Sequence, residues 1–390
     1  MDHPQSITYL MFLIFTGTAV LSTLALFTRQ SLLVAYIALG ALLGPWGLRL
    51  VSDSTIIEQA GEIGIIFLLF LLGLHLQPQN LFHSLRKMSW IAFISSVLLF
   101  LLGFLVSYLF GFSTNDCLII GTTTMFSSTI IGLKLLPTTV LHHQHTGELV
   151  ISVLLLQDLL AILVLLLLQA IADRQLSLHE MLLIAIAVPT LILVAYVFER
   201  FFLSWLLRRF DKFHEYIFIL SIGWCLCMAQ LSHGLGLSAE IGAFIAGIAL
   251  ASNPISLYIA ENLKPLRDFF LVIFFFTVGA GFNFTYLPAV IVPAFVLGGL
   301  ALIFKPLVFR WLLHRAGEMK SVSWEIGIRL GQMSEFSLLI IYLAYKTNFI
   351  QPLTSYTVQA ATIITFIVSC YWVVLYYPTP LATSDKLRRD

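Results

Sequence analysis

The chain has 390 residues, of which 59% are hydrophobic and only 11% are charged. This composition is typical of a polytopic membrane protein and excludes a soluble globular domain. The net charge of +1 provides no electrostatic basis for binding nucleic acid.

Apolar runs of membrane-spanning length, separated by Pro, Gly or charged residues, follow one another along the chain. We predict thirteen, at residues 7–27, 31–51, 56–76, 88–110, 116–136, 147–171, 178–206, 215–233, 237–252, 266–286, 289–313, 321–346 and 353–377. The opening residues MDHPQS lack the basic region of a cleavable signal, so we expect none. Four cysteines lie in or beside these runs and are expected to be buried small hydrophobes: Cys117, Cys225, Cys227 and Cys370. Their spacing suggests no metal site, and we expect no cofactor.

Basic residues are distributed unevenly between the two sets of loops. One set, with the C-terminal tail, contains Arg29, Arg86, Lys87, Lys134, Arg200, Arg208, Arg209, Lys212, Lys264, Arg267, Arg310, Arg315, Lys320, Lys386, Arg388 and Arg389. The other set contains Arg49, Arg174 and Lys346. Because cytoplasmic loops carry the excess of Lys and Arg, this pattern predicts an external N-terminus and a cytoplasmic C-terminus.

Two of the thirteen runs are unusual for continuous helices. Residues 116–136 gather Ser and Thr around Gly and Met, and residues 321–346 contain Gly327 and Gly331 beside several polar residues. Polar, Gly-interrupted segments in corresponding positions of two halves indicate an inverted repeat of broken helices around a central site. Tight helix packing without unwinding is the alternative explanation for the glycines.

One acid, Asp158, lies in the middle of about twenty apolar residues. A carboxylate at that depth costs roughly 2.5–3.5 kcal/mol on insertion scales, so it must face protein or a water-filled cavity. We therefore expect an ion pathway at Asp158, with a purely structural buried acid as the alternative. The adjacent Gln157 points about 100° away around the helix, so its amide can tether a neighbouring helix.

Several motifs resemble the second cation:proton antiporter superfamily, in particular the membrane domain of Kef-type potassium/proton antiporters. They are GIIFLLFLLGLHLQP at 64–78, FSSTIIGLKLLP at 126–137, LLLQDLLAI at 154–162, GLSAEIGAFIAGIALASNP at 236–254 and GQMSEFSLL at 331–339. Lys305 also falls where the family keeps a membrane-embedded lysine.

This resemblance implies an all-helical fold like that of the sodium/proton antiporters, in which a core domain moves against a scaffold. The core would comprise residues 88–175 and 288–390, and the scaffold residues 1–87 and 215–287, with 176–214 as connector. The scaffold is the expected homodimer interface. His75 occupies a position where relatives commonly have Glu, and no nucleotide-binding domain follows the last run, so gating through such a domain is not expected. A separate regulatory subunit remains a candidate partner.

We expect a proton and a monovalent cation to compete for the carboxylate of Asp158. A bare carboxylate is unfavourable in low-dielectric surroundings, so either a proton or a monovalent cation must accompany it. If only the occupied site crosses the membrane, one ion is exchanged for the other. A single acid suggests electroneutral exchange, and the Gln-Asp pattern favours K⁺ over Na⁺.

Other polar residues in the runs are expected to support the site. Lys305 is predicted to hydrogen-bond Gln157 or to snorkel toward the cytoplasm. Glu335 and Arg329 are predicted to neutralise each other or exposed helix ends; ion binding is the alternative, for which Glu335 is the better candidate of the two. Four hydroxyl residues could bind the ion or satisfy broken backbone: Thr123, Ser127, Ser128 and Thr129.

The remaining titratable residues receive structural interpretations. Glu62 is expected at a helix interface and Glu240 near a helix start. His75 and His233 are expected to lie at helix ends. The tract His142-His143-x-His145 is interpreted as solvated loop histidines, with pH sensing as the alternative.

Taken together, the sequence predicts a cation/proton antiporter of a bacterial cytoplasmic membrane, with a monovalent cation and protons as its substrates. A cation channel and a non-transporting membrane sensor subunit are the alternatives. An enzyme is not expected, because the polar residues of the runs form no catalytic set.

Overall fold

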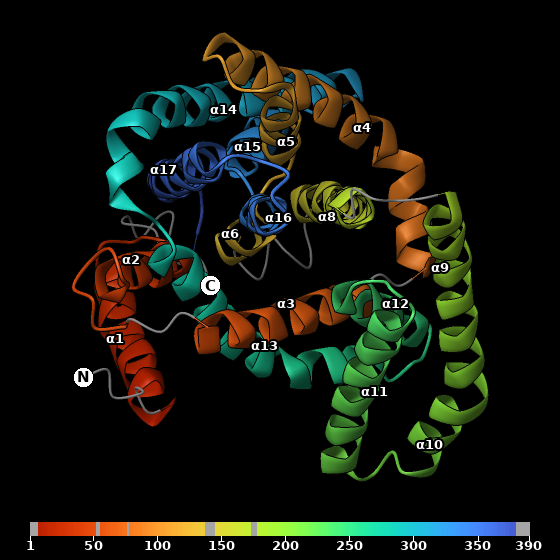
Figure 1. Cartoon of the computed structure of the whole chain (residues 1–390). Helices are drawn as coiled ribbons and strands as arrows, with labels where there is room; N and C mark the ends of the chain where they lie inside the picture. Colours follow the sequence, from red (N-terminus) through yellow and green to blue (C-terminus); the bar gives the residue numbers. More distant parts are fainter. Residues whose placement is uncertain (1–6, 52–54, 76–77, 137–144, 173–177, 380–390) are drawn as a thin grey trace, which may run out of the picture.

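The computed structural model describes residues 7–51, 55–75, 78–136, 145–172 and 178–379. Helices account for the regular structure of these segments (Figure 1). Eight helical stretches of the described chain are long and apolar enough to cross a membrane. Many of the exposed side chains on these helices are large and apolar, including Phe93 and Leu105. Such surfaces suit contact with lipid chains.

The helices and their bounds follow the expected order along the chain. They are α1 (Ile7–Phe27), α2 (Leu32–Leu43), α3 (Thr55–His75), α4 (Pro78–Leu109), α5 (Thr114–Met125), α6 (Thr129–Lys134), α8 (His145–Ala172), α9 (Leu178–Phe198), η1 (Glu199–Leu203), α10 (Ser204–Arg209), α11 (His214–Gly234), α12 (Ala239–Ala251), α13 (Ser256–Ala280), η2 (Phe284–Tyr286), α14 (Leu287–Arg315), α15 (Lys320–Arg329), α16 (Glu335–Lys346) and α17 (Pro352–Tyr376).

Each predicted run overlaps one of these helices or a consecutive set of them, but three bounds were wrong. Helix α2 ends at Leu43 instead of residue 51, because Gly44 precedes Pro45 and a residue before proline avoids the helical region. Helices α4 and α13 begin about ten residues earlier than predicted, at Pro78 and Ser256. Their first turns are polar, and hydropathy does not register the part of a helix that extends beyond its apolar run.

The helices lie in two groups (Figure 1). In one, α3 packs against α12 and α13, α13 packs against α2, and α11 packs against α12. In the other, α4 and α14 pack against each other, and α8 and α17 lie against the short helices between them. The second group contains both broken segments.

Paired glycines bring helices of the first group into backbone contact. A Cβ atom on Gly247 of α12 would lie 2.2 Å from the carbonyl oxygen of Phe70 in α3, and Gly73 faces the same crossing. Gly40 of α2 and Gly279 of α13 approach each other's helix in the same way. Small residues allow such close crossings of membrane helices, where packing replaces the hydrophobic effect as the driving force.

The second group shows a repeated pattern of a long helix, a broken helix and another long helix. The first unit is α4, α5 with α6, and α8; the second is α14, α15 with α16, and α17. Both predicted breaks are therefore confirmed, and the explanation by tight packing without unwinding was wrong. The prediction for the cysteines is confirmed for Cys117, Cys225 and Cys370, whereas Cys227 is exposed.

Candidate functional site

The two broken helices are interrupted by short extended segments, each closed by a serine. Helix α6 resumes after Ser128, whose side chain accepts a hydrogen bond from the amide of Ile131 at 3.1 Å. Helix α16 resumes after Ser334, which forms a capping box with Ser337. A serine cap satisfies amides at a new helix start, so these residues allow a helix to restart inside an apolar environment.

Asp158 lies on α8 beside the first of these breaks. The residue is 2% exposed, and the hydroxyl of Thr129 lies 3.0 Å from each of its two carboxylate oxygens. A hydroxyl has one proton to donate, whereas a carboxylate has about four lone-pair positions. Asp158 therefore keeps free acceptor capacity at the N-terminal end of α6.

Gln157 spans the same break from α8. Its Oε1 accepts a hydrogen bond from the amide of Ser127 at 3.1 Å, and its Nε2 donates to the carbonyl of Met125 at 3.2 Å. The side-chain amide thus replaces backbone bonds that the interrupted helix cannot make. The predicted tether to a neighbouring helix is present, while ion binding by Asp158 and Gln157 remains a prediction.

Lys305 of α14 is fully buried, and both predictions for it were wrong. Its ammonium donates to the carbonyl of Phe126, to the carbonyl of Gln332 at 2.8 Å and more weakly to the Ser127 hydroxyl at 3.4 Å. It therefore neither snorkels nor hydrogen-bonds Gln157. The carbonyl ends of α5 and α15 carry partial negative charge, and Lys305 compensates both.

Arg329 and Glu335 do not neutralise each other; each serves helix ends, the second predicted role. Arg329 pairs with Glu325 at 2.8 Å and donates to the carbonyls of Leu135 and Pro378 at 3.0 and 2.9 Å. Glu335 accepts a hydrogen bond from the amide of Ile130 at 3.2 Å. The cation thus lies at the C-terminal end of α6 and the anion at its N-terminal end, as the helix dipole favours.

Of the four predicted hydroxyl residues, Thr129 contacts Asp158. Thr123 bonds the carbonyl of Ile120 within its own helix at 2.9 Å. Ser127 donates to the carbonyl of Leu330 in the other break at 2.8 Å. Thr123 and Ser127 therefore satisfy backbone, and Ser128 acts as a cap.

Gln332 was not singled out as a site residue, although it joins the two breaks. Its Nε2 donates to the carbonyl of Ser128 at 3.4 Å, and its Oε1 accepts from Ser369 of α17 at 2.9 Å. An amide between Gly331 and Ser334 in an apolar run was the available signal, since buried amides in membranes need partners.

Outside the site, the predicted structural roles of Glu62, Glu240 and His233 are confirmed. Glu62 of α3 pairs with Lys346 at the end of α16. Glu240 lies in the first turn of α12, and His233 in the last turn of α11. The side chain of His75 lies outside the described residues.

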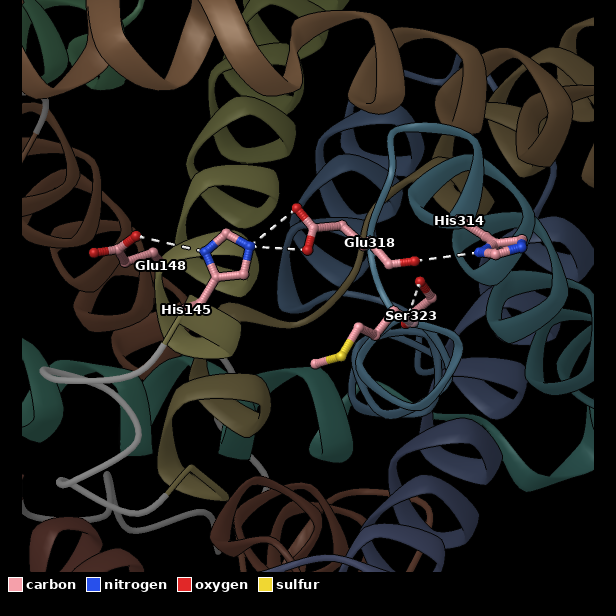
Figure 2. Close-up of polar contacts among 6 residues, drawn as sticks. His145, Glu148, His314, Glu318 and Ser323 are labelled. Atoms are coloured by element: carbon pink, nitrogen blue, oxygen red, sulfur yellow. Dashed lines mark hydrogen bonds and ion pairs between the residues drawn. The ribbon is translucent and has the colours of Figure 1, made fainter.

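The histidine tract is described only at His145. Its Nε2 lies 3.0 and 2.8 Å from the two carboxylate oxygens of Glu318, and its Nδ1 lies 3.9 Å from Glu148 (Figure 2). His314 contacts the carbonyl of Glu318 (Figure 2). The contact of His145 with Glu318 joins the start of α8 to the loop before α15. His142 and His143 lie outside the described residues, so pH sensing remains untested.

Comparison with known proteins places these features in context. A family model described as "Sodium/hydrogen exchanger, transmembrane" matches residues 11–376. K(+) efflux antiporter 6 of Arabidopsis thaliana is 28% identical over 333 residues, 83% of this chain and 55% of that protein. The glutathione-regulated potassium-efflux system protein KefC of Escherichia coli (strain K12) is 28% identical over 360 residues, 89% of this chain and 57% of that protein. The chain thus spans little more than half the length of these curated relatives.

A solved structure shares the overall fold. The sodium proton antiporter MjNhaP1 from Methanocaldococcus jannaschii superimposes with a TM-score of 0.61 at 18% identity, covering 96% of this chain and 94% of that one. The all-helical architecture with two broken helices is therefore that of a sodium/proton antiporter fold.

Proposed function

Because this chain belongs to the transmembrane sodium/hydrogen exchanger family, we propose that it exchanges a monovalent cation for protons across a membrane. The observation that carries the proposal is Asp158, buried where two broken helices meet and left with free acceptor capacity. Proton and cation compete for this carboxylate, and the occupied site alternates between the two sides of the membrane. The relatives are named as transporters and not as enzymes: K(+) efflux antiporter 6, a potassium-efflux system protein and a sodium proton antiporter.

The buried charges support exchange of one cation for one proton. Asp158 and Glu335 are acids, Lys305 is a cation, and Arg329 is paired with Glu325. With these groups ionised, the site has a net charge of −1. Since uncompensated charge is costly in a low dielectric, one proton or one monovalent cation completes the site.

The identity of the cation follows from the relatives rather than from the carboxylate. The sequence relatives are named for potassium efflux, and the structural neighbour is named as a sodium proton antiporter. An Asp carboxylate binds either ion. We infer K⁺ as the preferred substrate and Na⁺ as the alternative.

The moving core in this proposal is the group with both breaks, residues 88–175 and 288–390, and the scaffold is residues 1–87 and 215–287, linked by 176–214. The scaffold forms the homodimer interface, and a separate regulatory subunit is a further partner. The chain lies in a bacterial cytoplasmic membrane with its N-terminus outside and its C-terminus in the cytoplasm, the orientation that the distribution of Lys and Arg favours.

In this proposal, the path from Asp158 to the external face of the membrane is closed in the present structure. A small cavity between the two helix groups is lined by Ile162 and Leu165 of α8, which lie one and two turns beyond Asp158, and by residues of α3, α12 and α16. Glu240 is the one acid of the lining, and the other lining side chains are apolar. One turn farther out, the ion pair of Glu62 and Lys346 joins α3 to α16. Ions cannot pass such an apolar constriction, so this face must open during transport.

Joining Glu62 and Lys346 covalently should therefore stop exchange. In a Cys227→Ala background, Glu62→Cys with Lys346→Cys treated with a cleavable bifunctional maleimide should lose exchange by roughly tenfold or more, and cleavage of the linker should restore it. A cross-linker is preferred because long ion-paired side chains generally hold Cα atoms beyond disulfide reach.

The matched control is His145→Cys with Glu318→Cys. Both residues belong to the proposed core, so the same linker should leave exchange unchanged. Normal exchange after complete cross-linking of the Glu62 and Lys346 positions would show that this face does not open.

The proposal itself is tested with purified protein in proteoliposomes carrying an internal pH dye. Addition of K⁺ or Na⁺ should drive proton movement without creating a membrane potential. Cation flux that persists when the proton gradient is clamped would indicate a channel. Absence of any cation-triggered proton movement would favour a non-transporting sensor.

A further inference from the structure

Glu335 has a buried carboxylate oxygen without a partner. The residue is 3% exposed, its Oε1 accepts the amide of Ile130, and its Oε2 has no hydrogen bond among the described residues. The other buried side-chain atoms without partners in the described chain are neutral hydroxyls and the amide of Gln30. An unpaired charged oxygen is far more costly than an unpaired hydroxyl, so Oε2 calls for a ligand.

The position of Glu335 connects it to Asp158. Consecutive residues in the first turn of α6 hold the two acids: the Thr129 hydroxyl donates to Asp158, and the Ile130 amide donates to Glu335. Both carboxylates therefore lie against the same helix turn. Like charges at one buried site are stable together only when a cation or a proton lies between them.

The buried cations do not fill this role. The contacts of Lys305 are with two carbonyls and one hydroxyl, and those of Arg329 are with Glu325 and two carbonyls. The charge that balances the second carboxylate must therefore come from outside the described part of the chain.

Capping does not account for Glu335 either. The start of α16 is already capped by Ser334, which accepts from the amide of Phe336 at 3.1 Å, and by Ser337, which accepts from the amide of Ser334 at 3.3 Å. The start of α6 takes only one of the two carboxylate oxygens. Oε2 is left without a hydrogen bond among the described residues.

We propose that Glu335 is a second carboxylate ligand of the transported cation, binding it through Oε2 while Asp158 binds from α8. This inference rests on the proposed exchange function. Hard cations prefer several oxygen ligands, and the Thr129 hydroxyl, which contacts Asp158, adds a neutral oxygen.

The charge of Glu335 then sets the affinity for the cation. With Glu335 ionised, the empty site has a net charge of −1, which a bound monovalent cation neutralises. Without that charge, Asp158 and Lys305 already cancel, and a bound cation would leave an uncompensated +1. Loss of one charge-assisted contact should weaken cation binding on the order of tenfold or more.

The test compares Glu335→Gln and Glu335→Asp with the wild-type protein. Glutamine keeps an acceptor for the Ile130 amide but removes the charge. We expect the K⁺ and Na⁺ concentrations for half-maximal proton movement to rise on the order of tenfold or more in Glu335→Gln, with partial recovery in Glu335→Asp. Protection from thermal unfolding by KCl or NaCl, relative to choline chloride, should decrease in parallel, because a ligand stabilises the folded state that binds it.

The control is Glu148→Gln, an acid-to-amide change at a side chain that is 80% exposed. That variant removes a carboxylate that is not among the buried charges of the site, so the cation concentration dependence should not change. Wild-type concentration dependence and wild-type salt protection in Glu335→Gln would overturn the inference while leaving the exchange function intact. Failure of the exchange function has a different signature, because the wild-type protein itself would then show no cation-triggered proton movement.

Discussion

Asp158→Asn should abolish cation-triggered proton movement, with a loss of at least about 100-fold. Asparagine keeps the shape of the side chain and an oxygen for the Thr129 hydroxyl, but it neither releases a proton nor attracts a cation. The fold should remain intact, and the melting temperature should be unchanged or higher, because the substitution removes repulsion between Asp158 and Glu335. Dye-monitored proton flux and thermal unfolding of the same preparation measure the two effects.

The control is Glu148→Gln, an acid-to-amide change on the same helix. Glu148 has an 80% exposed side chain and lies ten residues before Asp158, so exchange should stay at the wild-type level. Equal exchange by the wild-type and Asp158→Asn proteins would mean that Asp158 is a structural acid. The exchange function would then need another site.

Lys305→Met should destabilise the protein by roughly 2–5 kcal/mol. The substitution removes the donor to the carbonyls of Phe126 and Gln332 and leaves both buried without that partner. It also leaves two acids, Asp158 and Glu335, without the cation that compensates one of them. Thermal unfolding in detergent, followed by loss of the monodisperse peak, should show a clearly lower melting temperature.

Lys264→Met is the corresponding control, because the Lys264 side chain is 56% exposed and forms only a long ion pair with Glu261 at 3.9 Å. Exposed pairs contribute about 0–1 kcal/mol, so its melting temperature should barely change. A melting temperature of Lys305→Met equal to that of the wild type would show that the helix ends do not depend on Lys305.

The helices and the two breaks were predictable because their causes are local. A spanning helix needs about 20 apolar residues, and a break needs polar or Gly residues inside that length. Asp158 was recognisable for the same reason, since an isolated acid in an apolar run has few structural explanations. Helix ends in polar turns, such as the starts of α4 and α13, have no comparable signal.

The partners of buried charges were not predictable in the same way. Lys305 was expected to hydrogen-bond Gln157 or to snorkel toward the cytoplasm, but it is fully buried, and both Lys305 and Gln157 bind backbone groups of the breaks. Arg329 was expected to pair with Glu335 or to serve an exposed helix end; it serves a helix end, and its ionic partner is Glu325, one helical turn away on its own helix. The spacing of residues along the chain does not show which exposed helix end lies nearest to a given buried charge.

The sequence alone determined that this is a polytopic helical membrane protein with two interrupted helices and one central acid. Composition, length of apolar runs and the cost of burying a charge are sufficient for that conclusion. Only the tertiary structure decided which groups compensate the helix ends and that a second carboxylate, Glu335, lies beside the same turn as Asp158. These contacts join residues about 30 and about 200 positions apart. Such contacts form because buried polar groups must find partners in three dimensions, and the packing of α6, α8 and α16 determines which partners are within reach.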